Sequence, residues 1–524
     1  MEQEEQRKRL LKSTLAVSGP TVLSRILGYV RDMIQAFFLG TSSGADAFTI
    51  AYIIPNLLRR LTGEGTMTAA FVPVFTQLKR EESKEKLWKF ANTFFYDLTV
   101  VMAFLTVLGI IFSPLLVKII APGFGDIHGK WALTVVLTRI MFPYIFLISL
   151  AALAMAILNS FHKFAAPAFT PVLFNLSIIC LAIILGRKVE EPAYVFAAGV
   201  VIGGVFQLAF QLPFLWKTGM RFKFGLSFSH PAVRRVGALM VPGIFGMGIS
   251  QINLAASRIF ASFLEEGSAS SLYYATRVSE LTLGLFSIAL SIALLPTLSE
   301  LAAHKDIAGM KKTLIFASKL MFLITLPAAV GLLVLCRPII QILFERGVFG
   351  AQSTEMTASV LFFFSIGLPF ISLVKILAPA FYSLKDTRTP VIIAFFVMIA
   401  YVSLSLVLMK PLRVGGIGLA LSLGEVFNFF LLYVFLERKI GKIDKKEIFS
   451  SFIRSLASAA LMGAVVWFFM RSFEFQRLQF LQQLGILLVT ILLGIMSYVL
   501  LSYLFNRQDL KSLKDVFAKE RVSQ

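Results

Sequence analysis

Long apolar segments alternate with short polar segments along almost the whole chain. A helix needs roughly 20 apolar residues to cross a hydrocarbon layer of about 30 Å, and runs of this length occur about fourteen times. The pattern therefore predicts an all-α polytopic membrane protein with about fourteen transmembrane helices. The expected spans are residues 14–39, 45–78, 87–120, 131–158, 166–185, 193–216, 233–264, 271–301, 314–335, 357–384, 390–409, 417–436, 453–470 and 481–504.

Two pairs of similar segments indicate a weak internal repeat. AFFLGTSSGADAF, from Ala36, aligns with ASFLEEGSASSLY, from Ala261, and NSFHKFAAP, ending at Pro167, aligns with YSLKDTRTP, ending at Pro390. Both pairs have nearly the same offset, about 225 residues, which contains six spans. Because six is an even number, we expect two six-helix lobes in parallel topology, with any substrate site near the midplane between them.

The repeat divides the chain into four parts. We expect residues 1–225 to form an N-lobe with helices 1 to 6, and residues 226–440 to form a C-lobe with helices 7 to 12. Residues 441–506 would form helices 13 and 14, and residues 507–524 a basic tail. Alternating access by rocking of the two lobes follows as a hypothesis.

Composition and charge narrow the class of protein. Of the 524 residues, 57% are hydrophobic and 15% are charged, which excludes a soluble multi-domain enzyme. The net charge of +21 would suggest nucleic acid binding in a soluble protein, but here the positive-inside rule and anionic lipid explain it better. With the N-terminus inside, inward segments hold roughly 30 Lys and Arg against roughly nine outside. We therefore expect both termini in the cytoplasm, and the mixed charges of the first residues predict no cleaved signal peptide.

Candidate chemistry is concentrated in the first two spans, where a central arginine costs on the order of 2.5–3.5 kcal/mol. The charged residues in or beside these spans are Arg25, Arg31, Asp32, Asp46, Arg59 and Arg60. Such residues are expected to face a watery cavity. A spacing of seven puts Arg25 and Asp32 on one helix face. Glu64 is placed to pair with Arg60, which leaves no obvious local partner in the sequence for Arg59.

The second half carries a matching cation. Arg277 lies in SLYYATRVSEL, and Glu280 follows one turn later. If Arg31, Arg59 and Arg277 converged in one cavity, they would suit a diphosphate, because guanidinium groups bind its oxygens by bidentate hydrogen bonds. The alternative pairs Arg31 with Asp32, and Arg277 with Glu280, as ordinary intramembrane ion pairs. The residues alone leave both interpretations open.

Signals for catalysis or metal binding are weak. Cys180, Cys336 and the four histidines lack metal-ligand spacing, and the sequence has no Gly-rich phosphate loop or Ser/His/Asp arrangement, so we expect no enzyme activity. Turns that could act as gates are expected at the FERG and KDTRTP segments. Further polar residues in apolar spans, which could line a cavity or pack helices, are Asp97, Arg139, Lys375, Glu425 and Asn428.

Long, ordered motifs extend over nearly all the spans. They are LSRILGYVRD, ADAF, IPNLLRRL, GEG, APGF from Ala121, ILNS from Ile157, LFERGVF from Leu343 and APAFYSLKDTRTPV from Ala378. In these motifs the chain resembles the MurJ (MviN) family of the multidrug/oligosaccharidyl-lipid/polysaccharide exporter superfamily. The resemblance implies a V-shaped, two-lobed transporter that flips lipid II, the undecaprenyl-diphosphate-linked peptidoglycan precursor, from the inner to the outer leaflet of the bacterial cytoplasmic membrane.

The resemblance also implies which residues bind the substrate. They are Arg25, Arg31, Asp32, Asp46, Asn56, Arg59, Ser270, Arg277 and Glu280. Helices 13 and 14 resemble the family's groove for the polyprenyl tail. The implied partners are lipid II, membrane lipids and peptidoglycan-synthesis proteins, without nucleic acid. A related exporter of another polyprenyl-linked glycan or of drugs is the alternative, and a membrane enzyme or scaffold of wall synthesis is a third.

One position departs from the family pattern. Some members carry an Asp four residues after an Asn in the seventh span, at a sodium site, whereas Asn253 is followed at that spacing by Ser257, with Arg258 beside it. We therefore expect no sodium at that position and no other metal or cofactor. Membrane potential and an ion gradient are the candidate driving forces. Moving one charge through 100 mV is worth about 2.3 kcal/mol, which would suit a cationic cavity.

Overall fold

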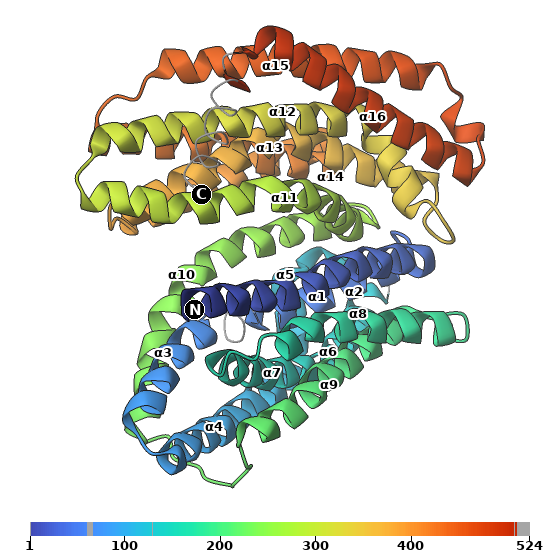
Figure 1. Ribbon diagram of the computed structural model, residues 1–524. Coiled ribbons are helices and arrows are strands. Elements are labelled where there is room, and N and C mark those ends of the chain that lie inside the picture. Colours follow the sequence, from blue (N-terminus) through green and yellow to red (C-terminus); the bar gives the residue numbers. More distant parts are fainter. Residues whose placement is uncertain (1, 60–65, 128, 508, 511–524) are drawn as a thin grey trace. The chain divides into compact units, whose positions relative to one another are not determined.

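The computed structural model describes residues 2–59, 66–127, 129–507 and 509–510. Within these ranges the chain forms α-helices joined by short turns, with two short 3-10 helices and no β-strand (Figure 1). The predicted all-α fold is therefore confirmed. The pair expected between Arg60 and Glu64 lies outside the described residues.

The chain divides into two compact units. The first unit comprises Met1–Ser270 together with Arg346–Phe349, and the second comprises Ser271–Glu345 and Gly350–Gln524. The division into two six-helix lobes, a helix pair and a tail rests on the sequence repeat and stays a prediction.

The first unit is a bundle in which helices distant in sequence pack side by side. Helix α1 packs on α8, α8 and α7 pack on α9, α2 packs on α6, and α10 packs on α3 (Figure 1). Its helices are α1 (Glu2–Leu39), α2 (Ser43–Arg59), α3 (Thr66–Glu81), α4 (Lys84–Ile111), α5 (Ser113–Ile120), η2 (Pro122–Asp126), α6 (Lys130–Met141), α7 (Pro143–Ser160), α8 (Ala165–Leu185), α9 (Ala193–Thr218) and α10 (Pro231–Ser262).

Proline divides two of the predicted spans of the first unit. The span expected at residues 87–120 ends at Phe112 and resumes as α5, whose first turn contains Pro114. The span expected at residues 131–158 consists of α6 and α7, which begins at Pro143. Proline has no N–H group to donate to the preceding turn, but it is well tolerated in the first turn of a helix. Each predicted span therefore becomes two consecutive helices.

In the second unit, α12 and α13 form the centre of the bundle. Helix α13 packs on α12 and α14, while α15 lies along α12 and α16 packs against α15 (Figure 1). The helices are α11 (Ser268–Ala303), which begins in the first unit, α12 (Ile307–Phe344), α13 (Ala351–Ser383), α14 (Arg388–Ile440), α15 (Lys445–Arg471), η3 (Phe475–Arg477) and α16 (Phe480–Phe505).

Helix α14 contains two of the predicted spans. Its 53 residues are interrupted at Arg413, whose φ of 50° and ψ of −132° are far from helical values. Pro411 lies two residues earlier, where it removes a backbone donor from the helix. The spans expected at residues 390–409 and 417–436 fall on either side of this break.

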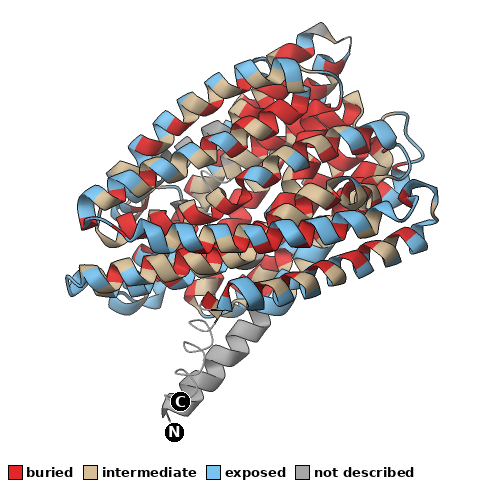
Figure 2. Ribbon diagram, turned by 90° about the horizontal axis from the view of Figure 1, so that it is seen from above, coloured by how far each residue is buried: buried red, intermediate tan, exposed pale blue. Residues whose placement is uncertain are grey.

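The distribution of buried and exposed residues along the helices is typical of a protein surrounded by lipid. Nine helical segments of the described residues are long and apolar enough to cross a membrane. Figure 2 shows that buried and exposed positions alternate along individual helices. In α16 most exposed positions are themselves apolar, and Leu492 and Met496 are 59% and 70% exposed. A helix that is apolar on all faces is typical of a membrane span. The count of fourteen stays a prediction.

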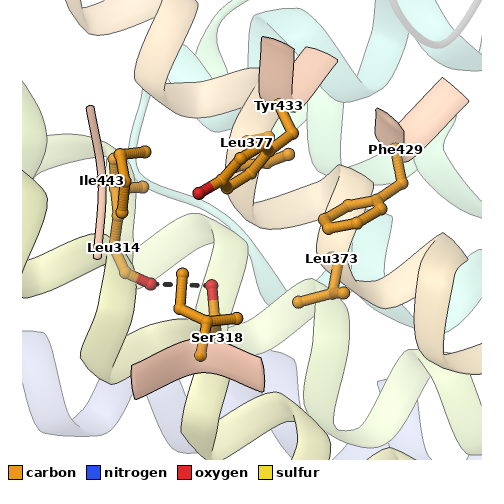
Figure 3. A pocket seen from close by; sticks show the side chains of 8 residues that line it. Leu314, Ser318, Leu373, Leu377, Phe429, Tyr433 and Ile443 are labelled. Carbon is orange, nitrogen blue, oxygen red and sulfur yellow. Dashed lines mark hydrogen bonds between the residues drawn. The ribbon is translucent and has the colours of Figure 1, made fainter. Parts of the chain in front are cut away.

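A small pocket in the second unit has an apolar lining. Figure 3 shows its side chains, which come from α12, α13, α14, α15 and the connection between α14 and α15. The lining residues are Leu314, Ser318, Leu373, Leu377, Phe429, Tyr433, Ile443 and Ile448. The hydroxyl of Ser318 donates to the carbonyl oxygen of Leu314 at 2.8 Å. Because that polar group is already bonded within its own helix, we interpret the pocket as a gap in packing.

Candidate functional site

Arg31 is buried in the first unit and held by two side chains. Its Nη2 lies 2.7 Å and its Nε 3.1 Å from Oδ1 of Asp32, and its Nη1 donates to Oδ1 of Asn175 in α8 at 3.2 Å. The side chains of Arg31 and Asp32 are 9% and 1% exposed. A buried guanidinium needs a countercharge and hydrogen-bond acceptors, and both are present here.

Asp46, in the first turn of α2, is the centre of a second buried network. Its Oδ2 lies 2.7 Å from Nζ of Lys130 and accepts the backbone N–H of Gly267 at 2.8 Å. Its Oδ1 accepts both the backbone N–H and the hydroxyl of Ser270, each at 2.8 Å. The carboxylate thus joins α2, α6 and the first turn of α11. In this structure its oxygens are occupied by protein donors, which makes Asp46 a connecting residue.

The turn before α11 brings these donors to Asp46. Gly267 has a φ of +90°, and a Cβ atom there would lie 2.6 Å from the carbonyl oxygen of Thr41. Only glycine combines this backbone conformation with such a close approach. The N–H groups at the start of a helix lack intrahelical partners, so a carboxylate is a favourable ligand for them.

The remaining predicted residues of the first unit are less enclosed. Nε of Arg59 donates to Oδ1 of Asn56 at 2.9 Å, one turn earlier in α2, and both residues are half-buried. Arg25 is exposed on α1. Asn56, predicted as a substrate ligand, therefore supports Arg59 in this structure.

Arg277 and Glu280 form an exposed pair in the second unit. Nη1 of Arg277 lies 3.1 Å from Oε2 of Glu280, and the side chains are 36% and 51% exposed. The guanidinium also lies 5.8 Å from the centroid of the Tyr273 ring. Both local pairs of the alternative interpretation, Arg31 with Asp32 and Arg277 with Glu280, are thus present. Convergence of Arg31, Arg59 and Arg277 in one cavity stays a prediction.

Comparison with known proteins identifies the family. The model of the family described as lipid II flippase MurJ matches residues 35–489. This chain belongs to that family. A probable lipid II flippase MurJ of Vibrio cholerae is 36% identical over 470 residues, covering 88% of this chain and 89% of the relative. A lipid II flippase MurJ of Burkholderia cenocepacia is 36% identical over 464 residues, covering 87% and 90%.

Solved structures agree with this assignment. A lipid II flippase MurJ in an inward closed conformation matches with a TM-score of 0.77 and 27% identity, covering 94% of this chain and 99% of the other. A multidrug resistance MATE family transporter of the MOP superfamily, in an inward-facing conformation, matches with a TM-score of 0.67 and 13% identity, covering 80% and 96%. The second likeness indicates a shared fold.

Other polar residues of this MurJ-family chain make hydrogen bonds within or between elements. Asp97 accepts the backbone N–H of Ser227 at 3.0 Å, and Arg139 donates to the Ser113 hydroxyl at 3.0 Å. In the second unit Asn428 donates to Glu425 at 3.2 Å. The first contact joins α4 to the connection before α10 and the second joins α6 to α5, as polar groups inside membrane proteins commonly do, whereas the third lies within α14.

At the position where we expect no sodium, the side chain of Asn253 lies outside the described residues. Ser257 is buried, and Arg258 beside it donates to the carbonyl oxygen of Ala269 at 2.9 Å. In the part of the chain that the structure describes, no three His, Cys, Asp or Glu side chains are grouped as metal ligands.

The sequence patterns missed two residues of these networks, Lys130 and Asn175. Lys130 stands at the start of an apolar segment, where a lysine usually reaches the headgroups, and Asn175 is a single polar residue in apolar α8. The only available signal was that polar groups in a span tend to find partners on other helices. That rule names no partner for either residue.

Proposed function

We propose that this chain flips lipid II from the inner to the outer leaflet of the bacterial cytoplasmic membrane, for peptidoglycan synthesis. Membership of the MurJ family supports the substrate, and the apolar helices support a multi-pass membrane location. The likeness to MATE transporters concerns the fold, so it gives no support to drug export.

The buried Arg31 cluster is the observation that carries the proposal. An arginine inside a membrane protein is costly, and such a residue by default indicates a functional site. Asp32 and Asn175 orient its guanidinium, which stays charged at any physiological pH. A diphosphate would exchange for the neighbouring acceptors, since its oxygens accept the same bidentate hydrogen bonds.

Arg59 and Arg277 extend the proposed head-group site. Each is only partly buried and is held by a neighbour on its own helix, Asn56 for Arg59 and Glu280 for Arg277. Such local support orients an arginine, and a guanidinium has five N–H groups with which it can bind the oxygens of a ligand. Arg25, Asp32, Asp46, Ser270 and Glu280 complete the proposed set, with Asp46 and Ser270 acting through the contact between them.

The exposed apolar faces of α15 and α16 suit a route for the polyprenyl tail. Trp467 and Phe468 on α15, and Leu500 and Leu504 on α16, are large apolar side chains at 45% to 65% exposure. We propose that the tail stays in contact with these helices while the head group crosses by alternating access. Both termini are proposed to be cytoplasmic, and peptidoglycan-synthesis proteins are proposed partners.

Binding measurements with purified protein test the head-group site. Lipid II, undecaprenyl phosphate and an unrelated lipid-linked glycan are compared for the parent protein and for Arg31→Ala, Arg59→Ala and Arg277→Ala. We expect lipid II to bind preferentially and each variant to bind it at least about tenfold more weakly, since a charge-assisted bidentate contact is lost. Arg477→Ala is the matched control, because Arg477 forms a similar i, i+3 pair with Glu474 but is 80% exposed.

Transport is then measured in liposomes carrying fluorescent lipid II. The parent protein should move the label between leaflets, and the three arginine variants should not, although all remain folded. Equal binding of the three lipids, or unchanged lipid II binding after loss of the arginines, would contradict the proposed substrate site.

We further propose that membrane potential drives the cycle without sodium at the Ser257 position. The buried guanidinium of Arg258 lies beside that position, and a positive charge there disfavours a bound cation. Collapsing the potential with a potassium ionophore should stop transport, whereas replacing sodium by choline should not. Loss of transport in choline would contradict this.

A further inference from the structure

Lys130 is a fully buried lysine whose charge is matched by one carboxylate. Its side chain and that of Asp46 are each 1% exposed, and Nζ lies 2.7 Å from Oδ2. Nζ also lies 4.2 Å from the centroid of the Phe124 ring, which faces the ammonium group. Lysine is almost never fully buried unless it is paired, so the burial of Lys130 depends on its ion pair with Asp46.

Asp46 has two kinds of partner that belong to different elements. Lys130 comes from α6, which packs on α2 and so stays beside Asp46. Gly267 and Ser270 come from the turn before α11 and from its first turn. The positive end of the α11 dipole adds to the attraction that these donors exert on the carboxylate.

The ion pair with Lys130 lowers the free-energy cost of separating Asp46 from α11. Without it, withdrawal of the α11 donors would leave a buried carboxylate with no countercharge, which is strongly unfavourable. With it, the carboxylate stays paired after the withdrawal, and only hydrogen bonds are lost. Lys130 therefore makes the contact between Asp46 and α11 reversible.

We propose that Lys130 is a positioning residue that keeps the Asp46 carboxylate paired, so that its contact with the first turn of α11 can break and re-form during transport. The proposal rests on the proposed transport cycle. It differs from a purely structural role, in which the pair would only fasten α2 to α6.

The two interpretations predict different effects of removing each partner. If Lys130 makes the contact reversible, Lys130→Met leaves Asp46 dependent on α11 and holds the contact closed. Asp46→Asn weakens the attraction for the α11 donors and favours the open contact. If the pair only holds α2 and α6 together, both substitutions loosen the same packing. Their effects on the contact between Asp46 and α11 then have the same direction.

Ser268→Cys provides a reporter in the first turn of α11. Ser268 is 0% exposed, and its hydroxyl has no hydrogen-bond partner in the described part of the chain, so the substitution removes no bond. Cys180 and Cys336 are first replaced by serine. A membrane-impermeant maleimide is added outside intact cells, because positive-inside topology puts this turn at the outer surface. Labelling then measures how often the turn separates from Asp46.

We expect Lys130→Met to slow labelling at least threefold and Asp46→Asn to accelerate it at least threefold. Lys130→Arg should keep the parent rate, because it retains the charge. Lys118→Met is the matched control and should change nothing, since Lys118 is an exposed lysine of neighbouring α5. Effects of the two main variants in the same direction, or an unchanged rate in Lys130→Met, would overturn the proposal.

A double variant covers the case in which Lys130→Met fails to accumulate. Asp46→Asn with Lys130→Met contains no unpaired buried charge and should label at the rate of Asp46→Asn alone, because Lys130 acts only through Asp46. A further change in the double variant would contradict the proposal. The labelling needs no lipid II, so it remains decisive even if the substrate proposed above proves wrong.

Discussion

Asn175 of α8 joins Arg31 to Ser24, which lies about two turns earlier in the same helix. Oδ1 of Asn175 accepts from Nη1 of Arg31 at 3.2 Å, while Nδ2 donates to the carbonyl oxygen of Ser24 at 3.0 Å. One amide therefore contacts both the guanidinium and the backbone of α1. Because α1 and α8 pack together, a helix far away in sequence helps to position the arginine.

Replacing Asn175 by alanine should impair transport while the protein stays in the membrane. The guanidinium would lose an acceptor, and an unsatisfied buried group costs about 1–3 kcal/mol. We expect transport of fluorescent lipid II to fall about three- to tenfold. Asn159→Ala, at a half-buried position of α7, is the control and should behave as the parent protein does. An Asn175→Ala protein with parental transport would mean that the contact with Asn175 is not needed to position Arg31.

Gly367 should tolerate no larger side chain, because α13 and α14 approach each other there. A Cβ atom at Gly367 would lie 2.7 Å from Cα of Ser422, and the N–H of Gly367 donates to the Ser422 hydroxyl at 3.1 Å. Gly367→Val should therefore lower the unfolding temperature in detergent by several degrees, through overpacking that typically costs about 1–3 kcal/mol.

Gly331 is the control for that substitution. A Cβ atom there meets no heavy atom within 4 Å, so Gly331→Val should change the unfolding temperature little. Equal shifts in the two variants would show that the effect is one of valine in a helix and not of the close contact with Ser422.

Asp509 should hold the end of α16 against α12 and α15. Its carboxylate lies 3.1 Å from Nη2 of Arg454 and 3.3 Å from Nζ of Lys319, and it accepts the Ser451 hydroxyl at 3.0 Å. Asp509→Ala would leave two cations without this buried countercharge. We expect trypsin to cleave after Arg507 at least about threefold faster, as local opening becomes easier.

A matched substitution in the same region checks whether faster cleavage after Arg507 is specific to the loss of Asp509. Asp444→Ala removes only the cap at the start of α15, where Asp444 accepts the backbone N–H of Lys446 at 3.0 Å. It should leave cleavage after Arg507 at the parent rate. Parental cleavage in Asp509→Ala would contradict the proposed anchoring.

Asp386, in the turn between α13 and α14, should give a stability contribution that depends on pH. Burial favours a higher pKa, but hydrogen bonds from Lys439 and Thr389 and the charge of Lys439 outweigh it and lower the pKa of Asp386 to about 2. A carboxyl with a depressed folded-state pKa stabilises the protein above its unfolded-state pKa of about 4. This contribution is lost as the pH falls toward about 2.

Asp386→Asn should therefore lower the unfolding temperature in detergent at pH 7, and the difference from the parent protein should shrink below about pH 4. The effect should stay below about 1 kcal/mol, because Lys439 is 40% exposed and water screens the pair. A difference that does not change between pH 7 and pH 3 would contradict the assignment to the charge of Asp386.

The spans were predicted from hydropathy, which is a property of local sequence. Apolar runs of membrane length predicted the helices from α4 to α16, and the break at Arg413 falls between two predicted spans. The motifs around Arg31 and Asp46 indicated the family. The divisions at Phe112 and Phe142 were missed, because hydropathy does not distinguish one helix from two that are joined at a proline.

The sequence by itself determined that this chain is a helical membrane protein of the MurJ family and that arginines lie where a membrane disfavours them. Hydropathy and charge are properties of single residues and of their near neighbours, so they can be read without coordinates. Only the tertiary structure decided which groups meet: Arg31 with Asn175, and Asp46 with Lys130 and the first turn of α11. Each of these contacts joins residues more than 80 positions apart. Their pairing depends on which helix faces pack together, and the energy of that packing is spread over many residues.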